Sequence, residues 1–282
     1  MALVFQSPTA VKFDSNRAWE HLRRLVALGP RPAGTPAIEQ SRKYIKDQLA
    51  AVGVSVVEQA WEGLTPLGPV HMVNLIATIP GASKNRLVIA SHYDTKRFRE
   101  FRFVGANDGG SSTAFLIELA RVLKARANPL TIELLFLDGE EAVNWNWDDK
   151  TTDHTYGSRY YVQQATQAGT TKDIKAFILV DMIGDRDLGI QREGYSTAWL
   201  TDAVWSAAKQ LKRPEFLDSV TPIEDDHLEF LAADIPSVDI IDLDYPAWHT
   251  AEDDLAHVSA RSLQVVGDVL LAALPAIEAR VK

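Results

Sequence analysis

The chain has 282 residues, 46% of them hydrophobic, so it can bury a substantial core as one large domain or two small ones. Its formal net charge of −9 argues against a nucleic-acid partner, because phosphates require a basic protein surface. It contains no cysteine, which excludes disulfides, thiolate nucleophiles and cysteine-ligated zinc, so any metal must be held by His, Asp or Glu.

The first half of the chain is predicted to begin with two helices. Residues 17–28 show an amphipathic pattern, and Thr35-Pro36 supplies an N-cap hydroxyl and an N1 proline for a second helix that Gly53 ends. Short apolar and β-branched runs predict strands, and the glycine-rich segment 105–112 opens a helix to about Lys124. The predicted strands of this half are 54–58, 72–79, 86–91 and 131–137. A basic, aromatic loop, RFREFRF, occupies residues 97–103; such loops are most often solvated.

The second half continues the alternation of strands and helices. Its predicted helices are 156–168, 197–211, a short one headed by Asp225-Asp226-His227, and a last one from about Ser259; its strands are 176–180 and 237–243. This alternation predicts an α/β fold, a three-layer α/β/α sandwich with a central mixed, mostly parallel sheet. No linker rich in Pro, Gly or Ser divides the chain, so we expect residues 1–282 to form a single catalytic domain.

Two further expectations concern membranes and location. No apolar run approaches about 18 residues, so no membrane-spanning helix is expected. The N-terminal segment lacks the basic and apolar regions of a signal peptide. The protein is therefore either cytoplasmic, or periplasmic or secreted after removal of a leader.

Histidines and acids repeatedly follow the predicted strands directly. In open α/β sheets the functional site lies outside the carboxyl ends of the strands, where adjacent carboxylates can divide metal binding and proton transfer. An isolated Glu-Glu pair is usually only a solvated strand end, but repeated ligand types after several strands indicate a metal site. Such ligands suit zinc, with three protein ligands and one open position. These residues are His92, Asp94, Glu140, Glu141 and Asp181, with Asp108 and His249 in loops after further elements.

Seven segments between residues 91 and 254 carry a resemblance to a known family. They are SHYDTK, FVGANDGGSS, LLFLDGEEA, YGSR, VDMIGD, EDDHLEFL with IPSVDII, and WHTAEDD, in this order. As a set they resemble the M28 family of zinc-dependent aminopeptidase-fold proteins, and within it the animal-type glutaminyl cyclases (glutaminyl-peptide cyclotransferases). Glu224 departs from the cyclase pattern, which tends to carry Gln there, and the missing cysteine pair of the animal enzymes suggests a bacterial relative.

The resemblance implies how the site binds metal. Asp108, Glu141 and His249 would hold one zinc ion. In two-zinc aminopeptidases His92 and Asp181 would complete a second metal site, with Asp108 as the bridge. Cyclases resemble these enzymes at the same residues but leave the second site without metal.

The resemblance also implies a reaction. Glu140 would be the general acid/base, with Asp181 and Asp225 in an acidic hydrogen-bond network beside it. The expected activity converts the N-terminal Gln of peptides to pyroglutamate and releases ammonia. The alternatives are a two-metal aminopeptidase and a non-enzymatic binding module on the same fold. We expect a monomer that takes peptide or protein substrates. The residues expected to line the substrate pocket are Trp248, with Trp145 and Trp147 as further candidates. In cyclases the loop equivalent to residues 97–103 can border the mouth of the site.

Overall fold

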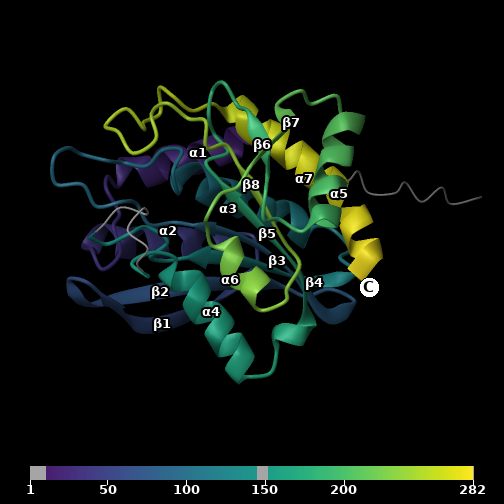
Figure 1. The fold of residues 1–282 in the computed structure, drawn as a ribbon, viewed down its shortest axis with the longest axis horizontal. Helices are drawn as coiled ribbons and strands as arrows, with labels where there is room; N and C mark the ends of the chain where they lie inside the picture. Colours follow the sequence, from purple (N-terminus) through teal and green to yellow (C-terminus); the bar gives the residue numbers. More distant parts are fainter. Residues whose placement is uncertain (1–10, 145–151, 282) are drawn as a thin grey trace, which may run out of the picture.

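The computed structural model describes residues 11–144 and 152–281, and its centre is one six-stranded sheet (Figure 1). The strand order is β1-β2-β4-β3-β5-β8. Strands β4, β3, β5 and β8 run parallel, and β2 and β1 join one edge in antiparallel pairing. The strands are β1 (Ser55–Thr65), β2 (Gly68–Ile79), β3 (Ser83–His92), β4 (Leu130–Leu137), β5 (Ile174–Asp181) and β8 (Ser237–Ile241). The expected mixed, mostly parallel sheet is therefore confirmed.

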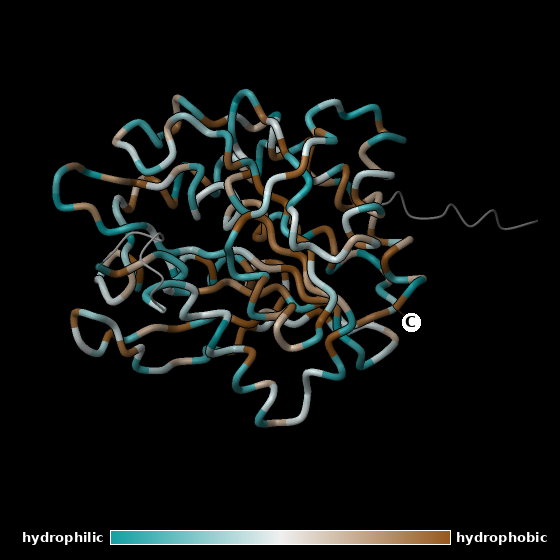
Figure 2. The backbone as a smooth tube through the Cα atoms, viewed as in Figure 1, coloured by the Kyte–Doolittle hydropathy of each residue, from teal (hydrophilic) through white to brown (hydrophobic). Residues whose placement is uncertain are grey.

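Helices cover both faces of this sheet. Alternate residues of a strand point to opposite faces, so in β3 Leu87 and Ile89 join one core, and Val88 and Ala90 join the other. The larger core packs beneath α1 (Ser15–Ala27), α2 (Pro36–Ala51), α3 (Gly110–Lys124), α5 (Ala198–Gln210) and α7 (Ala260–Val281). The smaller core packs beneath α4 (Tyr156–Gln167) and α6 (His227–Ala232). The central strands are the most hydrophobic part of the trace, as expected for a sheet covered on both faces (Figure 2).

Helix α7 corrects one expectation. By length and composition it could cross a membrane, although the sequence had suggested no segment of that kind. However, 61% of its apolar window is buried, and Val266, Leu270, Leu274 and Ile277 belong to the larger core. A core helix passes the same test of length and composition. The apolar character of α7 is therefore accounted for by its packing.

The structure also contains strands that the sequence pattern did not predict. Strand β1 is much longer than the predicted 54–58, because polar residues and a glycine interrupt its apolar pattern after Val57. Strands β6 (Ile190–Glu193) and β7 (Phe216–Thr221) form a second, two-stranded parallel sheet. A 3₁₀ turn, η2 (Thr171–Asp173), precedes β5.

Candidate active site

The candidate site lies where the central parallel strands end. Strand β3 ends at His92 and β5 ends at Asp181, while Glu140 and Glu141 follow the end of β4. Asp94 fixes the loop after β4, because its carboxylate accepts the backbone N–H of Glu140 at 3.2 Å and that of Glu141 at 3.3 Å. Parallel strands bring their carboxyl ends to one edge, which explains why residues far apart in sequence meet here.

A tight turn before α3 supplies Asp108. The carboxylate of Asp253 accepts the backbone N–H groups of Asn107 at 2.7 Å and Asp108 at 3.1 Å. Gly109 follows with φ +72°, and a Cβ at this position would lie 2.5 Å from the carbonyl oxygen of Asp94. Only glycine fits so close to the neighbouring backbone in this conformation. The turn therefore holds the Asp108 side chain at the edge of the sheet.

Asp108, Glu141 and His249 form a cluster with the properties of a metal site. One ligand atom from each residue lies within 4.8 Å of the others. Nε2 of His249 lies 3.4 Å from Oδ2 of Asp108 and 3.5 Å from Oε1 of Glu141. These distances exceed the usual N–H···O range of about 2.7–3.2 Å but match the roughly 3.4 Å between ligands of a tetrahedral zinc ion with bonds of about 2.1 Å.

The electrostatics of this cluster favour a cation. Oδ2 of Asp108 and both carboxylate oxygens of Glu141 are buried without a hydrogen-bond donor among the described residues. Burial acts to lower the pKa of His249, but the carboxylates of Glu141 and Asp108 raise it to about 10. Lys96 lies at 3.8 Å from Oε2 of Glu141. Two buried carboxylates with free oxygens and one imidazole are a donor set that zinc binds in proteins, so the residues fit this ion.

His92, Asp108 and Asp181 form a second, fully buried cluster. Here Nε2 of His92 lies 3.1 Å from Oδ1 of Asp181 and 3.2 Å from Oδ1 of Asp108, which is within hydrogen-bond range. Burial acts to lower the pKa of His92, yet Glu140 and Asp181 raise it well above its usual value. The ring therefore hydrogen-bonds to Asp181 and lies in ion-pair contact with Asp108.

Glu140 stands among other acids. Burial raises the pKa of Glu140 well above its usual value, and the charges of Glu141 and Asp225 add to the rise. The pKa of Asp225 is also raised by burial, together with the charges of Asp181 and Asp226. A carboxyl group in these surroundings binds a proton more strongly than a free Glu or Asp does, which suits a group that accepts a proton and returns it.

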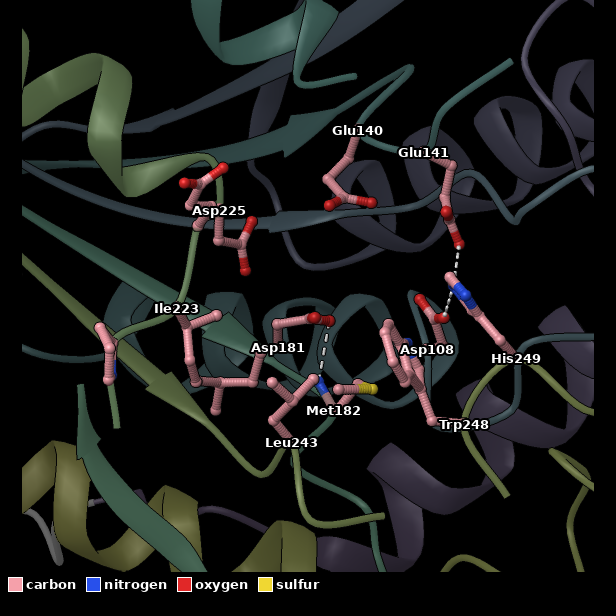
Figure 3. Close-up of a pocket in the computed structure, with 13 residues that line it drawn as sticks. Asp108, Glu140, Glu141, Asp181, Met182, Ile223, Asp225, Leu243, Trp248 and His249 are labelled. Carbon is pink, nitrogen blue, oxygen red and sulfur yellow. Dashed lines mark hydrogen bonds and ion pairs between the residues drawn. The ribbon is translucent and has the colours of Figure 1, made fainter. Parts of the chain in front are cut away.

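These side chains border a cavity of about 430 Å³ (Figure 3). Asp108, Glu141 and His249 gather at one side of it, while Asp225 lies at the other. Trp248 is 40% exposed and lines the cavity, as expected. Trp145 and Trp147 lie outside the described residues. Among the described residues, the lining consists of Asp108, Glu140, Glu141, Asp181, Met182, Pro222, Ile223, Glu224, Asp225, Ile241, Leu243, Trp248 and His249.

The sequence did not single out several residues of the site. Met182, Ile223 and Leu243 form an apolar wall, and their residue types gave no signal beyond core packing. Asp253, which fixes the Asp108 turn, lies in the segment WHTAEDD and could have been found from that motif. Met182 and His249 have φ values of +45° and +53°, so two side chains of the cavity stand on backbone that is strained for residues other than glycine.

Residues 74–274 match the Peptidase family M28 domain, which is more than half of the chain. The chain belongs to peptidase family M28. Among its relatives, this M28 protein is 32% identical to a glutaminyl-peptide cyclotransferase-like protein of Bos taurus, over 92% of this chain and 75% of that protein.

Solved structures resemble the M28 chain over nearly its whole length. A glutaminyl cyclase from an Acidobacteriales bacterium superposes with a TM-score of 0.91 and 39% identity, covering 99% of each chain. A leucine aminopeptidase precursor from Bacteroides thetaiotaomicron superposes with a TM-score of 0.86 and 28% identity, covering 94% of this chain and 98% of that one. The three-layer α/β/α architecture is thus shared with cyclases and with a protein named as an aminopeptidase.

Proposed function

We propose that this M28 protein is a zinc-dependent glutaminyl-peptide cyclotransferase. Its substrates are peptides with an N-terminal Gln, and its products are the pyroglutamyl peptide and ammonia. The observation that carries the proposal is the match to a glutaminyl cyclase over 99% of both chains at 39% identity. The resemblance thus extends beyond the metal-site motifs that cyclases share with peptidases.

Three residues would hold one zinc ion in this proposal. They are Asp108, Glu141 and His249, whose ligand atoms converge beside the cavity. When bound there, zinc supplies a Lewis acid that polarises the carbonyl of the substrate γ-carboxamide. The buried oxygens of Asp108 and Glu141 that have no hydrogen-bond donor among the described residues provide the negative charge that retains the ion.

Glu140 moves the protons. Its carboxylate takes one proton from the substrate α-ammonium, and the freed amine forms a bond with the γ-carboxamide carbon. The bond from that carbon to the amide nitrogen then breaks, and Glu140 returns a proton so that ammonia leaves. The lactam nitrogen gives up its second proton, which ends on ammonium in solution. The raised pKa of Glu140, caused first by burial, lets this group hold the proton between the steps.

The apolar walls of the cavity suit a cyclisation in which water is not a reactant. Trp248, Ile223 and Leu243 give it an apolar lining beside the acids. The attacking nitrogen and the carbonyl belong to the same Gln residue, so the enzyme gains most by holding that residue in a compact conformation. An apolar wall favours this conformation and keeps hydrolytic water away from the polarised carbonyl.

The test is a pair of assays on one zinc-loaded sample. The first follows ammonia release and a mass loss of about 17 Da from a Gln-initiated peptide. This is the mass of the ammonia that leaves in the proposed cyclisation, with a proton from Glu140. The second follows hydrolysis of a Leu-initiated amide. We expect ammonia release without hydrolysis. Hydrolysis without ammonia release would refute the proposal and establish a peptidase.

A two-metal aminopeptidase is the second candidate. The observation that favours it is the buried cluster of His92, Asp108 and Asp181, which has the ligand types of a second zinc site. The hydrogen bond from Nε2 of His92 to Asp181, at 3.1 Å, favours the single-ion form instead, because a metal ion bound to both residues would replace it. The number of zinc ions per chain therefore separates the two candidates.

A further inference from the structure

The contacts of Nε2 with Asp108 and Glu141 do not explain what fixes the orientation of the His249 ring. His249 lies in the loop after β8, its side chain is 20% exposed, and its backbone is in the left-handed region at φ +53°. Metal-binding histidines usually donate their second ring N–H to a carboxylate, a backbone carbonyl or water, and a protein partner of this kind sets the ring orientation. Within residues 11–144 and 152–281, no hydrogen bond or ion pair reaches Nδ1 of His249.

Aromatic rings surround His249 instead. Phe98 stands edge-on to it, with ring centroids 5.5 Å apart and planes at 73°, and Phe103 does the same at 5.9 Å and 88°. Phe98 and Phe103 also contact each other edge-on, at 5.2 Å and 78°. Trp248 stacks on His249 with centroids 4.3 Å apart. Edge-on packing fixes the ring plane because the positive edge of one ring meets the negative face of another.

The two phenylalanines come from the basic loop 97–103, for which the composition favoured a solvated face and the family resemblance left open a position at the mouth of the site. Phe103 is only 1% exposed and anchors this loop, whereas Phe98 is half-buried between Phe103 and Phe101. Neither phenylalanine lines the substrate cavity. Their contacts with His249 therefore need an explanation other than substrate binding.

We propose that Phe98 and Phe103 are positioning residues for the metal ligand His249. Together they form an aromatic socket, which orients the imidazole so that Nε2 faces Asp108 and Glu141. The socket takes the place of the hydrogen bond that orients such a histidine in other metal sites. This inference rests on the proposed zinc site, but it does not depend on which reaction that site performs.

The test compares two phenylalanines of the same loop. Phe98→Leu removes a ring that contacts His249 directly. Phe101→Leu removes a ring that stacks on Phe98, with centroids 4.5 Å apart, and for which no contact with His249 is found in the described part of the chain. Zinc dissociation constants are measured on metal-free protein by competition with a chromophoric chelator. We expect zinc binding to weaken about 10-fold in Phe98→Leu, the smaller of the losses seen when a residue that orients a metal ligand is changed. Phe101→Leu should stay within about 2-fold of wild type.

Three further measurements separate positioning from general destabilisation. Phe98→Tyr keeps the ring and should restore wild-type affinity. The visible spectrum of the cobalt-substituted protein should change in Phe98→Leu and not in Phe101→Leu, because it reports ligand geometry. The melting temperatures of the metal-free proteins should be alike.

Defined results would overturn the proposal. Equal zinc affinities and equal cobalt spectra for Phe98→Leu and Phe101→Leu would exclude a role for the socket. A loss of affinity in Phe98→Leu that Phe98→Tyr does not restore would do the same. If wild-type protein binds no zinc, the proposed metal site is wrong, and the positioning role proposed for the socket is refuted as well.

Discussion

Glu140 and Glu141 are neighbours in the chain but have different surroundings. The Glu141 carboxylate lies beside His249 and Lys96, at 3.5 and 3.8 Å. The Glu140 carboxylate lies 3.6 Å from Nδ1 of His92 and borders the cavity next to the cluster of acids. Two chemically identical side chains can therefore take two roles, one holding the ion and one moving the proton.

Replacing Glu140 tests this division. Glu140→Gln should keep zinc but lower turnover by about 10² to 10⁴-fold, the usual contribution of a general acid/base. Glu141→Gln is the matched control, and it should lose both zinc and activity because it removes a ligand. The measurements are bound zinc after gel filtration and the rate of ammonia release. A near-wild-type rate in Glu140→Gln would show that another group moves the proton.

Replacing His92 tests the number of ions. In the single-ion form, wild-type protein and His92→Gln should each contain one zinc per chain, since His92 then only hydrogen-bonds to Asp181 and pairs with Asp108. In the two-metal form, the count should fall from two in wild type to one in the variant. Atomic absorption on desalted protein of known concentration measures this. Two ions in wild type would support the aminopeptidase.

At the scale of elements, the sequence pattern predicted most accurately the strands that helices cover on both faces of the sheet. Strands β3, β4 and β5 each contain a short, mainly apolar run, so they were recognised, and the acids that follow them were placed in one site. Strand β7 was missed because four of its six residues are exposed, and β6 because it has only four residues. The roles of His92, Asp108 and His249 came from the family resemblance, since spacing alone cannot show which loops meet.

Glu193, at the end of β6, joins the small sheet to the cavity. Its carboxylate accepts the backbone N–H groups of Tyr195 at 2.8 Å and Ile223 at 3.0 Å, and it lies 3.0 Å from Nε2 of His227. Burial acts to raise the pKa of Glu193, but His227 and these N–H groups lower it to about 2. The ionised carboxylate is thus bound more strongly in the folded chain than its protonated form.

This pKa predicts how stability depends on pH. The folded pKa lies below the ordinary value of 4.5, so the stabilisation is complete above pH 4.5 and is lost as pH falls towards 2. Glu193→Gln should lower the free energy of unfolding at pH 7 by up to about 3.5 kcal/mol, since the pKa falls by about 2.5 units and each unit is worth about 1.4 kcal/mol.

Urea unfolding of wild type and variant between pH 7 and pH 2.5 measures this difference, which should shrink as pH falls. The control is Asp202→Asn, which removes an exposed partner of Arg192 and should cost less than about 1 kcal/mol at every pH. A difference between wild type and Glu193→Gln that does not change with pH would contradict the assignment.

At the scale of the whole molecule, the two ends of the described chain close one core. The backbone N–H of Ser15 donates to Gln264 of α7 at 3.1 Å, and Phe13 packs against Phe115 of α3 at 4.9 Å. The family match begins only at residue 74, yet α1 and α2 cover the same face of the sheet as α3 and α7. We therefore propose that residues 1–282 unfold as one domain; the expected monomer also stays a prediction.

Metal removal tests the site and the single domain together. The buried acids Asp108 and Glu141 repel each other without a cation, and an ion that binds only the folded chain stabilises it by about 4 kcal/mol at a thousandfold excess over its dissociation constant. For a chain of this size that corresponds to a melting temperature lower by on the order of 10 °C after chelation.

Calorimetry of zinc-loaded and chelator-treated protein should show this decrease within a single transition, reversed by added zinc. His249→Ala should melt at the lower temperature with or without zinc, because it lacks a ligand, while Asp202→Asn should respond like wild type. An unchanged melting temperature after verified zinc loss would mean that the ion does not bind where the buried carboxylates are. Two separate transitions, of which only one responds to zinc, would instead place the site in one part of a chain that folds in two.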